Sequence, residues 1–86
     1  MRAEHNFKQS LPEFERAVFA NAVMFTTVSI RGRGQRERKE FGLDLNAAIA
    51  HAESDQRACV YAIAESGRAI VLDRAKWAEW RALRKS

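Results

Sequence analysis

The clearest hydrophobic pattern in the chain is the apolar run from Ala58 to Ala64, a polar Glu65-Ser66-Gly67, and a second run over residues 68–72. Short apolar runs rich in β-formers predict two strands that are covered on both faces. Gly67 supplies the positive φ that a three-residue hairpin loop requires. The resulting register pairs Ile63 with Ala69, Ala62 with Ile70 and Tyr61 with Val71, and it places Cys59, Tyr61, Ile63, Ala69 and Val71 on one face.

A helix is predicted over residues 73–85, directly after this hairpin. Asp73 is a suitable N-cap, and Leu72 with Trp77 has the spacing of a hydrophobic staple. Trp77, Trp80 and Leu83 then recur every third residue, which predicts a stripe that lies back on the sheet.

The preceding residues predict five further elements. Ser10 to Glu13 has the pattern of a capping box that starts a helix over residues 11 to about 21. Alternating and β-branched residues predict a strand over 23–30, and two glycines predict a turn over 31–35. A charged return strand over 36–41 and a helix from about 45 to 54, capped by Asp44, complete the order. We expect residues 1–9 to form a flexible arm and residues 10–86 to form a single domain.

These elements predict an α+β fold with the order α-β-β-α-β-β-α. A right-handed crossover gives a four-stranded antiparallel sheet with the strand order 2-1-3-4, a crossover helix and two terminal helices. The charged second strand then protects one edge. Apolar residues on both sheet faces predict that the middle helix covers one face and the terminal helices the other. A face left uncovered would favour a homodimer.

Composition limits the cellular setting. The only cysteine, Cys59, has no partner for an internal disulfide, and its apolar strand predicts an inert buried thiol. No apolar run approaches the ~20 residues of a membrane span, and the first residues lack a signal-peptide core. We therefore expect a cytoplasmic protein that does not engage a membrane.

Charge is distributed unevenly along the chain. The net charge is +4, and residues 31–39 hold five cations against one acid. Arginine side chains suit phosphate groups, and a two-stranded ribbon can enter a DNA major groove. Neutralising about four phosphates predicts a log–log salt slope of about −3.6 on duplex DNA. The candidate nucleic-acid-binding residues are Arg31, Arg33, Arg36, Arg38 and Lys39.

Two other interpretations of the hairpin remain open. Its charges are also typical of a solvated edge strand that avoids aggregation, or of a surface that meets an acidic protein. Phe41 is the only aromatic residue near these cations in the sequence, so the aromatic pattern of a single-strand binder is missing.

The tryptophan helix also has two interpretations. Trp77 and Trp80 are typical of a core stripe. Alternatively, Trp80, Arg81 and Arg84 form an exposed protein-interaction surface, because Trp and Arg often anchor interfaces.

Catalytic and metal motifs are weak. His5, His51 and Cys59 lack the spacing of a zinc site, and no glycine-rich loop indicates a nucleotide or another cofactor. Small ribonuclease toxins use scattered side chains, and Tyr61, His51, Arg57 and Arg68 are the candidates for such chemistry.

We therefore expect a non-catalytic binding module, a regulatory or accessory factor that docks on nucleic acid or a nucleoprotein through its basic β-hairpin. The alternative is a protein-interaction or inhibitor module that uses a sheet edge or the Trp77/Trp80 helix, with a ribonuclease as the third hypothesis.

Overall fold

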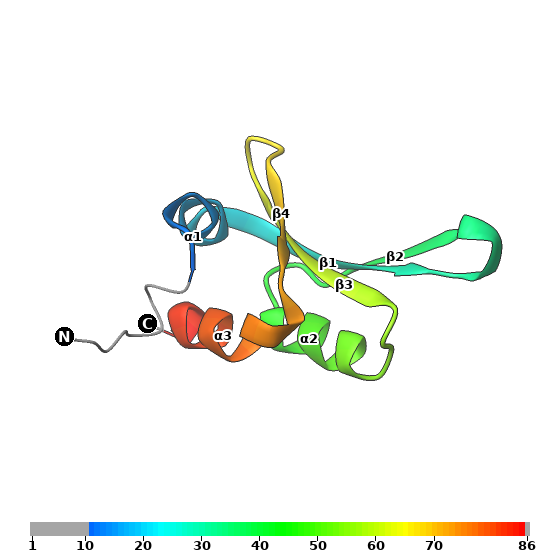
Figure 1. Ribbon diagram of the computed structural model, residues 1–86. Helices are drawn as coiled ribbons and strands as arrows, with labels where there is room; N and C mark the ends of the chain where they lie inside the picture. Colours follow the sequence, from blue (N-terminus) through cyan, green and yellow to red (C-terminus); the bar gives the residue numbers. More distant parts are fainter. Residues whose placement is uncertain (1–10, 86) are drawn as a thin grey trace.

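The computed structural model describes residues 11–85, and the predicted N-terminal arm and the Ser10 cap lie outside this range. The architecture is α+β in the predicted order, and the sheet runs β2-β1-β3-β4 with every neighbouring pair antiparallel (Figure 1). No helix within residues 11–85 is long and apolar enough to cross a membrane. The elements are α1 (Glu13–Ala20), β1 (Ala22–Ile30), β2 (Arg36–Glu40), α2 (Leu45–Glu53), β3 (Ala58–Ala64), β4 (Ala69–Leu72) and α3 (Trp77–Lys85).

The β3–β4 hairpin has the predicted register. Ile63 pairs with Ala69 and Tyr61 with Val71, and the Ala64 amide donates to the Arg68 carbonyl at 2.8 Å, which closes the loop of residues 65–67. Gly67 adopts a φ of 95°, a conformation that residues with a Cβ rarely take. The loop chemistry therefore fixes which side chains of both strands share a face.

Side-chain caps start the two later helices. Asp44 accepts a hydrogen bond from the Ala47 amide at 3.0 Å, and Asp73 accepts one from the Ala75 amide at 3.1 Å. A short 3-10 turn, Arg74–Lys76, precedes α3. The buried indole Nε1 of Trp77 donates to the Leu72 carbonyl at 2.9 Å. This bond fixes the angle at which the last helix leaves the sheet.

A single core lies between one sheet face and the helices. Phe25, Val60 and Leu72 point into it from three strands, and the rings of Phe19 in α1 and Trp80 in α3 lie 4.7 Å apart within it. Helices α2 and α3 lie on the same side of the sheet (Figure 1). The prediction that the terminal helices cover the opposite face is therefore wrong, because the Trp77, Trp80 and Leu83 stripe packs beside α2 rather than across the sheet.

The opposite sheet face, which we call the open face, is not covered by any described helix. Ile30 is 52% exposed and Val71 is 46% exposed. Cys59 is also exposed, so the prediction of a buried thiol is wrong. The apolar strand in which it lies has only one buried face. Alternation along β3 sends Val60 inward and Cys59 outward.

Candidate nucleic-acid interface

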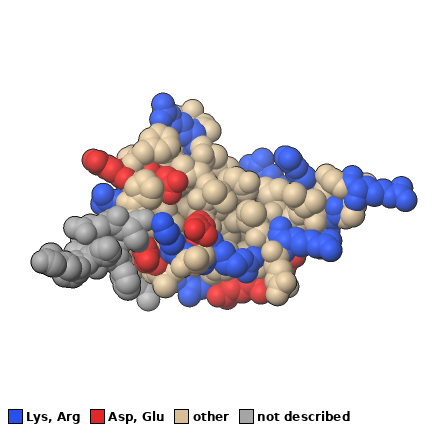
Figure 2. All heavy atoms as spheres, viewed as in Figure 1, with Lys and Arg blue, Asp and Glu red and all other residues tan. Residues whose placement is uncertain are grey.

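The β1–β2 hairpin projects from the body of the molecule (Figure 1). Pairing extends from Thr26 opposite Glu40 to Ile30 opposite Arg36, and residues 31–40 are all exposed. Figure 2 shows basic side chains gathered along this end. At the tip, Arg33 has a φ of 66°, a left-handed conformation that favours Gly or Asn over Arg. The hairpin is thus a paired ribbon that presents an arginine at its turn.

Acidic neighbours neutralise part of the predicted cationic set. The Arg31 guanidinium donates to Glu37 Oε1, with Nε at 2.9 Å, and its Nη2 lies 3.5 Å from Asp55. Arg31 is therefore held by two of the protein's own carboxylates.

The other hairpin cations differ in how they are paired. Arg38 lies 3.6 Å from Glu40, and both side chains are more than half exposed. Such an exposed pair is weak and exchanges readily with another anion. Arg33 and Arg36 have no ion pair with any residue in 11–85. Both guanidinium groups are therefore exposed and available to an incoming phosphate.

The carboxylates behind Arg31 have shifted acidities. The hydrogen bond from Arg31, with its positive charge, lowers the pKa of Glu37. Ser29 Oγ donates to Asp55 Oδ2 at 2.7 Å, and the Arg57 amide donates to Asp55 Oδ1 at 3.0 Å. These hydrogen bonds lower the pKa of Asp55. Both groups remain anionic at neutral pH and hold Arg31 in place.

Strand alternation divides the charges of β2 between its two sides. Arg36 and Arg38 pair with Ile30 and Val28, and these side chains share the open face. Glu37 and Lys39 point to the other side. The two arginines therefore extend the apolar open face, whereas Lys39 does not.

The open face is hollowed into a shallow depression of about 370 Å³. Arg57, Cys59 and Tyr61 enter it from the start of β3, opposite the β2 arginines. Phe41 is the only aromatic residue near the basic hairpin in the sequence, yet the centre of its ring lies 5.7 Å from the centre of the His51 ring in α2. Tyr61 is instead the aromatic side chain that lines the same depression as the arginines. The alternation of Arg57, Cys59 and Tyr61 already implied a shared face, but only the β1–β3 register brings that face to β2.

The predicted protein-interaction residues do not form an exposed aromatic patch. Trp80 is 1% exposed and packs on Phe19, which agrees with the core interpretation of the tryptophan stripe. Arg81 and Arg84 line a small depression beside Asp44, at the start of α2. Helix α3, which carries both residues, and the tip of the β1–β2 hairpin lie at opposite ends of the molecule (Figure 1), so these two arginines do not extend the basic surface of the hairpin.

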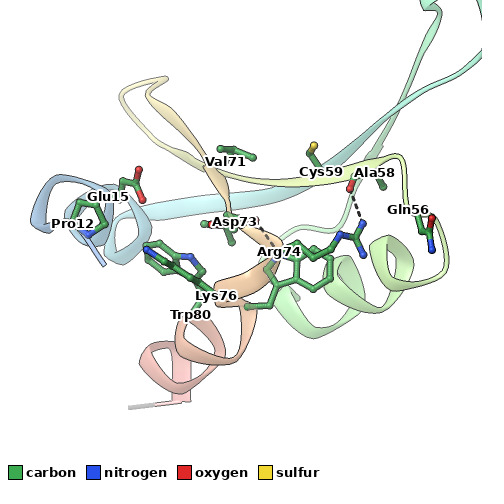
Figure 3. Close-up of a pocket in the computed structure, with 12 residues that line it drawn as sticks. Pro12, Glu15, Gln56, Ala58, Cys59, Val71, Asp73, Arg74, Lys76 and Trp80 are labelled. Carbon is green, nitrogen blue, oxygen red and sulfur yellow. Dashed lines mark hydrogen bonds between the residues drawn. The ribbon is translucent and has the colours of Figure 1, made fainter. Parts of the chain in front are cut away.

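A larger depression of about 500 Å³ follows the free edge of β4. Figure 3 shows Cys59 and Val71 pointing away from the helices and Arg74 reaching toward the Ala58 carbonyl. The Arg74 guanidinium donates to the carbonyls of Ala52, Asp55 and Ala58 at 3.1 to 3.2 Å and lies 4.6 Å from the centre of the Trp77 ring. Arg74 therefore links the start of α3 to the end of α2, and its guanidinium group stabilises the fold.

The candidate ribonuclease residues are not brought into one site. Tyr61 and Arg57 line the open face, whereas His51 lies on α2 beneath the other face. The Arg68 guanidinium lies 5.5 Å from the centre of the Phe14 ring, beside α1. Within residues 11–85, no three His, Cys, Asp or Glu side chains cluster closely enough to hold a metal ion, and His5 lies outside this range.

Comparisons with protein-family models, curated proteins and solved structures found no match to this chain.

Proposed function

We propose that this protein is a non-catalytic module that binds nucleic acid or a nucleoprotein through the β1–β2 hairpin and acts as a regulatory or accessory factor. The observation that carries the proposal is a projecting ribbon on which Arg33 and Arg36 have no ion pair with the rest of residues 11–85. Lone Cys59 fits a reducing cytoplasm, which we include in the proposal.

The chemistry of the exposed cations supports a phosphate ligand. Guanidinium groups donate planar, paired hydrogen bonds that match phosphate oxygens, and exposed arginines lose little hydration energy on binding. Arg33 occupies a backbone conformation that is unfavourable for its residue type. This costly position at the tip is consistent with a role in contacting a ligand.

The direct test is fluorescence anisotropy with labelled duplex and single-stranded DNA and RNA over a range of salt concentrations. We expect salt-dependent binding that falls at least tenfold when Arg33→Asn, Arg36→Gln and Arg38→Gln are combined, because three phosphate contacts are removed. The log–log salt slope should become less steep by about two to three units. Asn tolerates the left-handed turn position, so the variant keeps the hairpin geometry.

A charge-matched control removes three cations elsewhere, at Arg68, Lys76 and Arg84, each replaced by Gln. These side chains line other depressions than the one on the open face, so we expect less than a threefold change in affinity. Equal losses in the two variants would show that binding follows net charge alone. Absence of binding at low salt would contradict the proposal.

The free edge of β4 supports a second candidate function, a protein-interaction or inhibitor module. Within residues 11–85, strand β4 pairs only with β3, and Val71 at this edge is 46% exposed. An incoming strand can pair with such an edge and place an apolar side chain beside it. Arg81 and Arg84 would remain outside this contact.

This second function predicts one stoichiometric protein partner that survives nuclease treatment. Val71→Lys should remove the partner, because a charge at the edge opposes strand addition. The hairpin variant should retain it. A partner lost on nuclease treatment, or retained by Val71→Lys, would contradict this alternative.

A further inference from the structure

We propose that the open face binds a single strand of nucleic acid, with a base stacked on Tyr61 and the backbone phosphates held by Arg36, Arg38 and Arg57. The inference rests on the proposed function, but it names a different surface from the hairpin tip and a narrower class of ligand. It also requires two residues, Arg57 and Tyr61, that lie outside the basic hairpin.

The sheet register builds this surface from three strands. Arg38 on β2 lies opposite Val28 on β1, which lies opposite Cys59 on β3. With strands about 4.8 Å apart, the Cα atoms of Arg38 and Cys59 are separated by about 10 Å. Tyr61 lies one row further along, about 7 Å from Cys59. The ring and the arginines are therefore within the span of a few nucleotides.

The residue types match the two parts of a nucleotide. Tyr61 is only half-buried and lines the depression, so part of its ring is accessible to a base. Arg36, Arg38 and Arg57 line the part of the depression nearer the hairpin tip, and Glu40, which pairs with Arg38, lies in the same row of the sheet as Tyr61. The resulting net charge of +2 attracts a phosphate backbone.

The same charges oppose the other occupants of this face. A two-fold symmetric dimer would place two copies of one net-positive surface against each other, which costs free energy by like-charge repulsion. In a duplex, both faces of each base are already stacked on neighbouring bases, so no base face is free to stack on the Tyr61 ring. A single strand exposes bases and phosphates together and satisfies both parts of the surface.

The experiment measures the affinity of the full chain for three labelled probes, which are dT12, rU12 and a mixed 12-base-pair DNA duplex. We expect either single strand to bind at least fivefold more tightly than the duplex, and the preference between dT12 and rU12 identifies the sugar. Tyr61→Ala should weaken single-strand binding by about fivefold or more, because one stacking contact is lost. Tyr61→Phe keeps the ring and should restore binding to within twofold.

Charge variants separate this face from the hairpin in general. Arg57→Gln should weaken single-strand binding and reduce the salt slope by about 0.7, as expected for one lost phosphate contact. Lys39→Gln removes a cation from the other side of β2 and should change affinity less than twofold. Glu40→Gln removes the carboxylate beside Arg38 and should strengthen binding.

Cys59 provides an independent readout at the centre of the face. Saturating dT12 should slow alkylation of the Cys59 thiol at least fivefold, whereas the duplex should not. The reactivity of the thiol in Arg57→Gln and Tyr61→Ala without nucleic acid reports whether each variant keeps the native surface.

Different failures identify different errors. If the Arg33, Arg36 and Arg38 variant loses binding while Tyr61→Ala and Arg57→Gln do not, the open-face inference is overturned and the hairpin proposal stands. If no probe binds at a low salt concentration of about 50 mM, both the hairpin proposal and the open-face inference are overturned. Sedimentation that shows a dimer dissociated by Val71→Lys would instead assign the face to a second copy.

Discussion

The two faces of the sheet are built from alternate residues of the same strands, yet they differ in what they contact. Leu72 on the helix-covered face is 1% exposed, whereas its neighbour Val71 on the open face is 46% exposed. The covered face holds the core together. The open face carries arginines at one side and an accessible tyrosine. Because alternate residues of a strand face opposite sides of the sheet, we expect substitutions on the covered face to change folding stability and substitutions on the open face to change ligand binding.

The largest expected effect contrasts Leu72→Ala with Val71→Ala. Truncating Leu72 removes buried methyl groups and leaves a cavity, so we expect the free energy of unfolding to fall by about 2–5 kcal/mol. Truncating Val71 should change it by no more than about 0.5 kcal/mol. Urea unfolding followed by circular dichroism measures both. Similar losses would show that the open face is covered in solution.

A second contrast compares two arginines. Arg74 donates to three carbonyls that join α3 to the end of α2, whereas Arg36 has no ion pair with the other described residues. We expect Arg74→Ala to cost about 1–3 kcal/mol of unfolding free energy and Arg36→Ala to cost less than about 0.5 kcal/mol. The same denaturation experiment applies. A stable Arg74→Ala protein would contradict the structural role of this residue.

The smallest effect concerns acid stability. The pKa of Asp55 in the folded protein lies below its unfolded value of 3.8, chiefly because Ser29 donates a hydrogen bond to the carboxylate. Its stabilising contribution is therefore complete above pH 3.8 and is lost as the pH falls through the lower folded value. Asp55→Asn should unfold with a weaker dependence on pH below 5. Carboxyl chemical shifts followed by NMR during acid titration should show the lowered pKa directly.

Local rules predicted most of the fold. Gly67 set the turn of the β3–β4 hairpin, Asp44 and Asp73 capped their helices, and the charged strand β2 took an edge. Each of these features depends on a few neighbouring residues, or on connection rules that restrict strand order.

The uncovered face was not predicted correctly, because the pattern of apolar residues alone does not determine which face of the sheet each helix packs against. Residues in β3 are apolar on both faces, which suggested two covers, but Trp80 packs with Phe19 on the side of α2. The association of Tyr61 with the β2 arginines also depends on long-range pairing through β1. Sequence periodicity shows that Arg57 and Tyr61 share a face, but not that Arg36 and Arg38 continue it.

NMR mapping of dT12 binding tests the contrast between the two faces most directly. Amide chemical shifts should change along β2 and at Val28, Cys59 and Tyr61. They should change little in α2 and α3, because only the open face contacts the bound dT12. The same titration of the Tyr61→Ala protein should show smaller changes at Val28 and Cys59. Shift changes confined to the helices, or no shift changes at the highest concentration of dT12, would contradict the account.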